Sequence, residues 1–257
     1  MKLATFNCNS IRSRMDMILA WLRANEPDIL CLQETKVQDH EFPAQPLLDD
    51  GWQVAFKGMK SYNGVAIVSK RVPDEIHFGL DDGGPADEPR LAWARFGNVH
   101  VVNTYVPQGR EIDHEMYQYK LQWFARLEKF FAKHFTTDDL LVWTGDLNVA
   151  AEPMDVHNPK ERENHVCFHI DARRAFAKTR AWGFVDVFRK FHPEPGQYTF
   201  FDYRTVFSAN RGLGWRIDYI LATPPLAAKA ADSWIDIEPR LQPKASDHTF
   251  LAADFQT

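Results

Sequence analysis

The chain has 257 residues, of which 45% are hydrophobic and 13% aromatic, which is enough for one sizeable packed domain or two small ones. The formal charge of -5 means that the field of the whole molecule does not attract a polyanion, so a nucleic-acid partner would have to bind a local basic patch. The three cysteines include no Cys-x-x-Cys pair, and no apolar run approaches the roughly 20 residues of a membrane span. We therefore exclude a disordered chain, a thiolate metal site and a membrane-spanning protein, and we expect a soluble protein of the reducing cytoplasm.

Short apolar runs alternate with amphipathic segments through the first half of the chain. The strands expected here cover residues 3–6, 28–32, 52–56, 65–68, 91–96 and 99–106. Apolar residues at helical spacing predict a helix that ends before Pro27 and a longer one over residues 117–131. Residues 80–89, rich in Gly, Pro and acidic side chains, predict an exposed loop.

The second half repeats this plan. The run 140–144 predicts a buried strand that Gly145 breaks, and a helix over 172–182 is expected to end at a Gly183 cap. Further strands are expected at 198–201, 217–221 and 249–255. Because no linker or change of composition interrupts the chain, we expect a single domain over residues 1–257. Its predicted fold is α/β, a four-layer sandwich in which two mixed sheets pack face to face between helices.

Polar side chains stand at the ends of several of these strands. In Gly145-Asp146-Leu147-Asn148 a carboxylate and a carboxamide lie two positions apart, and extended backbone would point both the same way, although an ordinary turn explains this tetrapeptide equally well. The set to be gathered is Asn7, Glu34, Tyr105, Asp146, Asn148, Asp218, Asp247 and His248. If these side chains converge, they form a pocket of oxygen ligands with one imidazole and no sulfur, which suits Mg²⁺ or Mn²⁺ better than zinc.

Such a pocket predicts metal-assisted phosphoryl chemistry. We expect Glu34 and Asp247 on the metal with Asn7 nearby, while Asp146 takes a proton from a water that Asn148 orients. His248 would stabilise negative charge with Asp218 behind it; the alternative is a surface histidine in a turn. Tyr105 would donate to phosphate or to the leaving group, or it is an aromatic anchor. The side chains expected at or beside the metal are Asn7, Glu34, Asp146, Asn148, Asp247 and His248.

Seven blocks, in this order, resemble the exonuclease III branch of the endonuclease/exonuclease/phosphatase superfamily, the abasic-site (AP) endonucleases of base excision repair. They are Phe6-Asn7-Cys8-Asn9-Ser10-Ile11-Arg12, Pro27-Asp28-Ile29-Leu30-Cys31-Leu32-Gln33-Glu34-Thr35-Lys36, Tyr62-Asn63-Gly64-Val65-Ala66, Asn103-Thr104-Tyr105-Val106-Pro107, Gly145-Asp146-Leu147-Asn148, Gly214-Trp215-Arg216-Ile217-Asp218-Tyr219 and Ser246-Asp247-His248. Each block is weak alone, but the ordered set is specific and spans nearly the whole chain.

The resemblance implies a DNase I-like sandwich and Mg²⁺-dependent cleavage of the phosphodiester 5′ to an abasic site, with 3′-5′ exonuclease and 3′-phosphodiesterase or phosphatase activity. Its implied partner is double-stranded DNA with abasic sites or blocked 3′ ends, acted on by a monomer that binds no membrane and is nucleoid-associated in a bacterium. Family roles carry over to Glu34 as metal ligand and to Asn148, His248 and Tyr105 at the phosphate. Whether Asp146 or Tyr105 accepts the proton, and whether one or two metals act, stays open.

The resemblance also implies DNA contacts. Phe200, Trp215 and Ile217 match the wall of a small apolar pocket for the flipped-out abasic sugar, although the two aromatic residues are also typical core residues. Basic residues beside the matched blocks would bind backbone phosphates, or are simply solvated surface charges. They are Arg12, Lys36, Lys57, Lys60, Arg110, Lys160, Arg162, Arg211 and Arg216.

The chain departs from the family pattern at a few positions, and rival interpretations stay open. Asn9 stands where some family members carry Asp, Gln108 stands where others have Asn, and no regulatory N-terminal extension is expected before Met1. One alternative keeps the metal centre but changes the substrate, as in the nonspecific deoxyribonucleases, deadenylases, inositol-phosphate phosphatases and sphingomyelinases of the superfamily. Another is a non-catalytic nucleic-acid-binding relative, which would be expected to have lost the acidic residues that this chain keeps.

Overall fold

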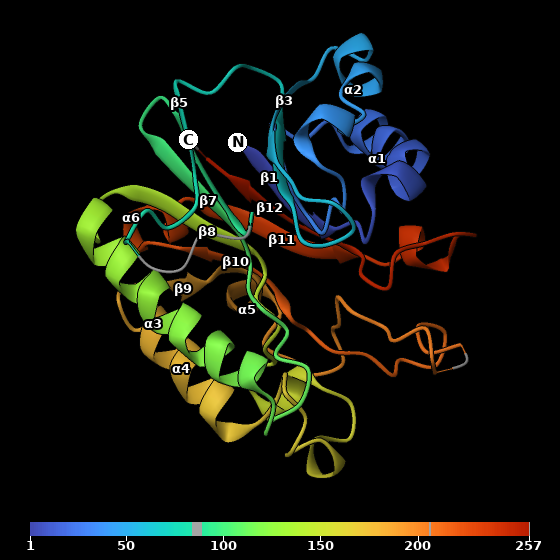
Figure 1. Cartoon of the computed structure of the whole chain (residues 1–257), viewed down its shortest axis with the longest axis vertical. Coiled ribbons are helices and arrows are strands. Elements are labelled where there is room, and N and C mark those ends of the chain that lie inside the picture. The colour runs from blue at the N-terminus through green and yellow to red at the C-terminus, as the bar shows by residue number, and fades with distance from the viewer. Residues whose placement is uncertain (84–88, 206, 257) are drawn as a thin grey trace.

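The computed structural model describes residues 1–83, 89–205 and 207–256, and it contains two six-stranded sheets packed face to face (Figure 1). Sheet A has the strand order β11 (Ala230–Asp236), β12 (Phe250–Phe255), β1 (Lys2–Asn7), β2 (Ile29–Gln33), β4 (Val65–Ser69) and β3 (Gln53–Lys57). Sheet B has the order β5 (Glu75–Phe78), β6 (Leu91–Phe96), β7 (Val99–Tyr105), β8 (Leu140–Asp146), β10 (Asp218–Ala222) and β9 (Val185–Asp186).

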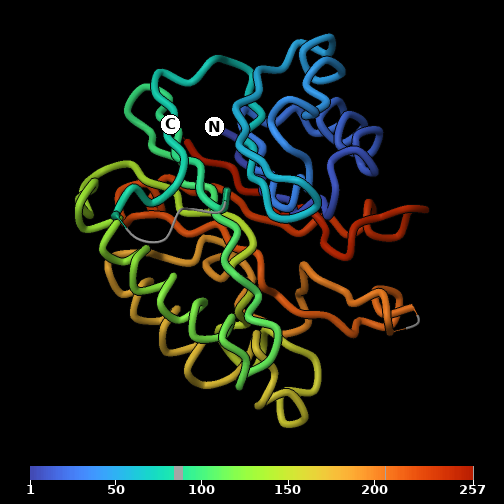
Figure 2. Tube along the Cα trace, in the orientation of Figure 1, coloured from blue at the N-terminus to red at the C-terminus, as the bar shows by residue number. Residues whose placement is uncertain are grey.

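The two sheets have the same order of parallel and antiparallel strand pairs. Each has a single parallel pair, β1 with β2 and β7 with β8, and all its other neighbours are antiparallel. A helix connects the strands of each parallel pair, as a parallel crossover requires. Because β12 pairs with β1, the two ends of the chain lie side by side (Figure 2), and the amide of Phe255 donates to the carbonyl of Met1 at 2.8 Å.

The longer helices form the outer layers. Helix α1 (Ile11–Asn25) covers sheet A, and the helices α3 (Glu115–His134) and α4 (Ile170–Arg180) cover sheet B (Figure 1). The remaining helices are short: α2 (Gln45–Asp49), α5 (Val187–Phe191), α6 (Pro224–Ala227) and the 3₁₀ turns η1 (Asp39–Glu41), η2 (Pro153–Asp155), η3 (Pro159–Glu161) and η4 (Glu238–Leu241). The prediction of a four-layer α/β sandwich is therefore confirmed.

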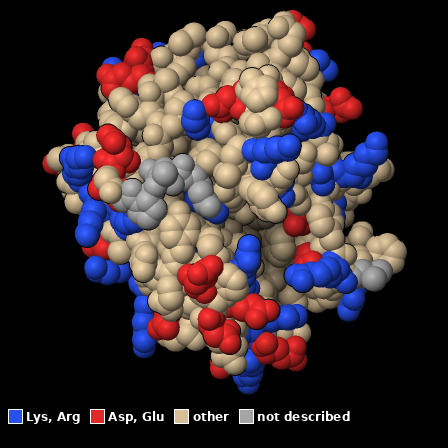
Figure 3. Space-filling view, viewed as in Figure 1, with Lys and Arg blue, Asp and Glu red and all other residues tan. Residues whose placement is uncertain are grey.

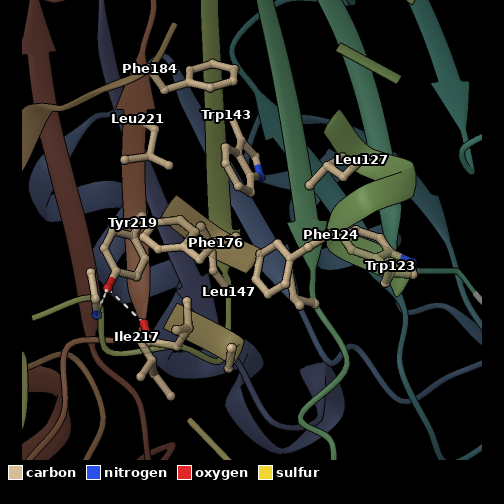
Figure 4. Packing of buried hydrophobic residues seen from close by; sticks show 14 of the residues in the cluster. Trp123, Phe124, Leu127, Trp143, Leu147, Phe176, Phe184, Ile217, Tyr219 and Leu221 are labelled. Carbon is tan, nitrogen blue, oxygen red and sulfur yellow. Dashed lines mark hydrogen bonds between the residues drawn. The ribbon is translucent and has the colours of Figure 1, made fainter. Parts of the chain in front are cut away.

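Three apolar layers hold the sandwich together: one between the sheets, one between sheet A and α1, and one between sheet B and the helices α3 and α4. Between the sheets, small and β-branched residues such as Ile67, Val101 and Ile220 allow the two inner faces to approach each other closely. Beneath α3 and α4 the core is aromatic: Figure 4 shows Phe124 and Leu127 of α3 near Trp143 of β8, with Phe176 of α4 beside them. In the described part of the chain, no helix combines the length and the apolar character that crossing a membrane would need.

The structure corrects several expectations about local structure. The expectation that Gly145 breaks the strand is wrong, because β8 runs through it to Asp146; the position needs a glycine, since a Cβ there would lie 2.0 Å from the main-chain oxygen of Thr104 on β7. The predicted strand 198–201 is wrong: Phe200 makes only isolated bridges to Trp215 and His248. There the side-chain oxygen of Thr199 accepts from the amides of Ile217 and Asp218, both at 3.2 Å, in place of a backbone ladder.

Other differences lie at edges and ends. The short strands β5 and β9 and the polar edge strand β11 were not predicted, because edge strands carry few of the apolar alternations that reveal a strand. Helix α4 ends at Arg180 with Ala181 as its cap, two residues before Gly183. Of the predicted loop 80–89, residues 81–83 are exposed and Leu80 is buried, whereas residues 84–88 lie outside the described residues.

Candidate active site

The polar strand ends meet at one edge of the sandwich. Asn7 ends β1, Glu34 follows β2, Tyr105 ends β7 and Asp146 ends β8, and the parallel pairing within each sheet puts these carboxyl ends level. Strands β10 and β12 run the opposite way, so the residues that begin or precede them, Asp218 and the pair Asp247-His248, lie at the same edge.

A pocket of about 460 Å³ opens there. Figure 3 shows a recess in this face of the molecule with acidic atoms inside it and Lys and Arg side chains around it. Its polar wall contains Glu34, Tyr105, Asp146, Asn148, Asp247 and His248, and its apolar wall contains Phe200, Leu213, Trp215 and Ile217. The structure thus brings nearly all predicted site residues together, and Asn7 and Asp218 lie directly behind the polar wall.

On the sheet A side, amides and one ammonium group hold the carboxylates. The Asn7 side-chain amide donates to Glu34 and to Asp146, at 2.8 Å each. Lys36 contacts Glu34 at 2.7 Å and donates to the Asn9 side-chain oxygen at 2.6 Å, while the Asn9 amide donates to Asp247 at 2.9 Å. Asn9 therefore links Asp247 to the Lys36–Glu34 pair.

These contacts decide the charge of Glu34. Burial acts to raise the pKa of this carboxyl, but the Lys36 ammonium and the Asn7 amide outweigh it and hold the pKa of Glu34 below its ordinary value. Glu34 is therefore ionised at neutral pH. Glu34 and Asp247, linked through Asn9 and Lys36, offer carboxylate oxygens of the kind that Mg²⁺ or Mn²⁺ prefers, while the Asn7 side-chain oxygen accepts from the Asn9 main-chain amide at 3.0 Å.

A second group of ligand atoms lies on the sheet B side. Single atoms of Asp146, Asp218 and His248 come within 4.8 Å of one another, but His248 Nδ1 lies 2.8 Å from Asp218. Burial alone would lower the pKa of His248, yet the carboxylates of Asp218 and Asp146 outweigh it and raise this pKa far above the usual range. Nδ1 of His248 is taken by Asp218, and a protonated imidazole repels a metal, while a cation at Glu34 would have to displace the Lys36 ammonium.

Asp146 lies between the two groups. Its carboxylate accepts from the Asn7 amide, from the Asn148 main-chain amide at 2.9 Å and from the Asn148 side chain at 3.2 Å, and His248 Nε2 is 3.7 Å away. Burial raises the pKa of Asp146, and the neighbouring carboxylates of Asp218 and Glu34 raise it further against the opposing His248. A carboxylate with a raised pKa is suited to accept a proton near neutral pH.

Asn148 is brought beside the Asp146 carboxylate by a turn, not by an extended strand. Strand β8 ends at Asp146, and Asn148 has a left-handed backbone with φ of +50°. Its side-chain amide also donates to the main-chain oxygen of Val106 at 3.0 Å. The expectation that an extended backbone presents both side chains is therefore wrong, although the two side chains do lie together.

Tyr105 is a protonated phenol. Burial, together with the carboxylates of Glu34 and Asp146, raises its pKa well above the ordinary value. The Arg90 guanidinium lies 4.9 Å from the centre of the Tyr105 ring. At neutral pH the Tyr105 hydroxyl is therefore a hydrogen-bond donor.

The apolar wall is part of the core and of the pocket at the same time. Trp215 and Ile217 are almost fully buried, yet both line the pocket. The main chains of Phe200 and Trp215 exchange two hydrogen bonds of 2.8 and 2.9 Å, and the Phe200 ring lies 5.0 Å from the His248 ring. The core interpretation and the pocket interpretation are therefore compatible, because the same side chains are packed in the core and line the pocket.

The predicted phosphate-binding residues differ in their surroundings, and one of them, Arg162, lines the pocket. Arg12 is exposed and pairs with Glu41, Arg110 is exposed beside His114, and Lys36 contacts Glu34 inside the site. The prediction that Arg216 is free to bind phosphate is wrong, because its side chain is buried and bonded to Asp155 and Asp186.

Sequence reasoning missed some pocket residues. His157, His165 and Arg204 line the pocket, and His165 packs on Trp215 with ring centres 4.5 Å apart. The sequence could have indicated Arg204, because it follows closely after the predicted pocket residue Phe200. It could not indicate the two histidines, because their place depends on how the segment 157–167 folds over Trp215.

Comparison with known proteins gives the same fold and the same class. The model of the Endonuclease/Exonuclease/phosphatase family matches residues 4–248. The exodeoxyribonuclease III of Haemophilus influenzae is 32% identical over the full length of both chains, and the exodeoxyribonuclease of Bacillus subtilis is 34% identical over 93% of this chain and 94% of that protein.

Solved structures are closer still. An AP endonuclease from Archaeoglobus fulgidus is 53% identical and superposes with a TM-score of 0.98, each chain covered completely. A 3′ phosphatase, NExo from Neisseria, solved bound to a product DNA hairpin, is 38% identical with a TM-score of 0.95, again over all of both chains. The chain therefore belongs to the endonuclease/exonuclease/phosphatase family, as a hydrolase of the exodeoxyribonuclease III and AP endonuclease kind.

Proposed function

We propose that this chain is a DNA repair nuclease that hydrolyses the phosphodiester 5′ to an abasic site in duplex DNA, with Mg²⁺ as its metal, and leaves a 3′-hydroxyl. One observation carries the proposal. A buried carboxylate with a raised pKa, Asp146, lies between Glu34, to which the Asn7 amide links it, and the His248 imidazole, and it lines the same pocket as the apolar Phe200, Trp215 and Ile217.

Glu34, with Asn7 and Asp247 nearby, would hold the metal, which would supply positive charge to the reacting phosphate. The chain's own residues do the rest. Asp146 accepts a proton from the attacking water, which the Asn148 side chain orients, and His248 donates an N–H to a phosphoryl oxygen as negative charge grows there. Asp218 keeps the imidazole charged and turned towards the phosphate.

Tyr105 is assigned as a donor to phosphate. Because its pKa is raised by burial and by two carboxylates, removing its proton near neutral pH is costly. Asp146 is the better acceptor, since its raised pKa still lies far below that of a buried phenol. The active unit that we propose is a monomer, because one chain supplies every residue of the site.

The substrate class follows from the apolar wall. A flipped abasic deoxyribose would lie against Phe200, Trp215 and Ile217 while its 5′-phosphate reaches His248, whose ring is 5.0 Å from Phe200. The same arrangement suits a terminal 3′-phosphate or a terminal nucleotide. We therefore include 3′-phosphatase and 3′-5′ exonuclease activity, which the names of the Neisseria relatives also support.

The test is incubation with four duplexes, carrying an abasic analogue, a 3′-phosphate, a uracil or no lesion, each with Mg²⁺, Mn²⁺ or EDTA. We expect incision 5′ to the abasic analogue with either metal and none with EDTA. Equal cleavage of the lesion-free and abasic duplexes would instead indicate a nonspecific nuclease. Binding without cleavage on all four would indicate a non-catalytic relative.

A further inference from the structure

Helix α3 buries a positive charge beneath the site. Lys120 is fully buried, and it stands on the same face of the helix as the apolar Tyr117, Phe124 and Leu127. Its ammonium donates to three main-chain oxygens, those of Asn148 at 2.6 Å, Val166 at 2.8 Å and Gln108 at 3.2 Å. In the part of the chain that the structure describes, no carboxylate forms an ion pair with it.

Burying this ammonium group costs free energy, and α3 could pack on sheet B with an apolar residue at position 120. Moving an ammonium group out of water requires compensation, and carbonyl dipoles satisfy its three N–H groups without cancelling its charge. Burial accordingly lowers the pKa of Lys120, while Cys167 and the Asp146 carboxylate oppose that effect. Lys120 is tied to the site through the main chain of Asn148, two residues after Asp146.

The three carbonyls belong to the three segments that line the pocket next to Asp146. Gln108 follows β7, Asn148 follows β8, and Val166 stands between His165 and Cys167, which both line the pocket. Cys167 also faces the side-chain oxygen of Asn148 at 3.8 Å, and the amide of Ala150 donates to the Cys167 carbonyl at 2.7 Å. Lys120 is the point where these segments are joined.

We propose that Lys120 is a positioning residue of the nuclease site, whose buried charge fixes the left-handed turn at Asn148 and stabilises negative charge at the phosphate above it. This inference rests on the proposed function. A charge held in a water-excluded interior acts more strongly than one in water and needs no reorganisation during the reaction. Since the phosphate gains negative charge in the transition state, the effect should fall mainly on kcat.

The experiment compares Lys120→Met and Lys120→Gln with wild type, and uses Lys129→Met, an exposed lysine of the same helix, as the matched control. Kinetics are measured on whichever of the four duplexes the wild type cleaves. Failure of abasic incision is then seen separately from failure of the Lys120 proposal, and a wild type that cleaves none of the duplexes overturns both.

We expect kcat of Lys120→Met to fall by about 10- to 100-fold while KM changes much less, because the charge acts on the transition state. The loss should be the same at about 50 and about 200 mM salt, since a buried charge is not screened as a surface lysine is. Lys129→Met should keep the wild-type kcat at both concentrations.

Circular dichroism and thermal unfolding show whether each variant is folded. Lys120→Gln retains hydrogen-bond donors without the charge, so it decides the matter if Lys120→Met does not fold. A folded Lys120→Gln with wild-type kcat, or a kcat loss that disappears at the higher salt concentration, overturns the proposal. An equal loss in both folded variants supports it.

Discussion

The two halves of the active site are built on sheets with the same order of pairings, yet their carboxylates have opposite character. After β2 of sheet A, the pKa of Glu34 is held low, because the Lys36 ammonium and the Asn7 amide outweigh burial. At the end of β8 of sheet B, burial dominates and raises the pKa of Asp146. One repeated framework therefore yields two carboxylates that share the Asn7 amide at 2.8 Å, one with a lowered and one with a raised pKa, to which we assign the metal-ligand and proton-acceptor roles of the proposed function.

The difference teaches that the neighbours decide the chemistry of a strand end. Asn7 donates to both carboxylates, so it does not distinguish them. Lys36 forms an ion pair with Glu34, whereas Asp146 faces the carboxylates of Asp218 and Glu34 as well as the His248 imidazole. The following changes test this division between a metal-holding half and a proton-transfer half.

The largest effect should come from Asp146→Asn. It keeps the shape of the side chain but removes the proton acceptor, so kcat for abasic incision should fall roughly 100-fold or more while the protein stays folded. His248→Ala should give a comparable loss, because it removes the donor to the phosphate. Single-turnover incision and thermal unfolding of the same samples measure both. Turnover near that of wild type in either variant would disprove the assignment of the proton-transfer half.

Lys36→Met tests the metal-holding half. Without this ammonium the pKa of Glu34 should rise, so the metal competes with protons and the acid limb of the pH–rate profile shifts to higher pH. We expect a loss of metal affinity or activity of about 10- to 100-fold at neutral pH, reduced by added metal. A metal titration at several pH values measures this. Lys178→Met, whose lysine pairs with Glu128 at the surface, is the control. An unchanged acid limb would contradict the role of Lys36.

Trp215→Ala tests whether the apolar wall selects the substrate without taking part in the chemical step. Removing this wall should lower abasic incision by about tenfold, the scale of a lost apolar pocket contact, and affect exonuclease cleavage of ordinary duplex less. The undamaged duplex is the internal control for folding and for the catalytic groups. Equal losses on both duplexes would refute the sugar pocket.

The smallest effect concerns stability on the sheet B side, where burial should govern. Burial lowers the pKa of His165 to about 4, so its folded-state pKa lies below the ordinary value. The resulting stability is present above about pH 6.5 and is lost as the pH falls towards the folded-state pKa. His165→Asn should flatten the fall of Tm between neutral pH and pH of about 4. A curve parallel to that of wild type would show that His165 does not titrate in this way.

Much of the fold could be predicted because its signals are local. Apolar runs marked nine of the strands, and helical spacing marked α1, α3 and α4. The prediction of a strand over 198–201 was wrong because Phe200 faces the pocket and the Thr199 side chain accepts from the amides of Ile217 and Asp218. The burial of Lys120 could also have been predicted, because it stands three residues after Tyr117 and four before Phe124, on the buried face of α3.

By itself the sequence determined the sandwich, the polar residues at the strand ends and the family resemblance, since periodicity, breaks and motif order depend on neighbours along the chain. Only the tertiary structure decided which groups share an environment. The Asn7 amide meets Asp146 across 139 positions, and His248 meets Asp218 across 30. The same holds for Lys36 on Glu34 and for the burial of Arg216, because charge and pKa depend on what surrounds a group in space.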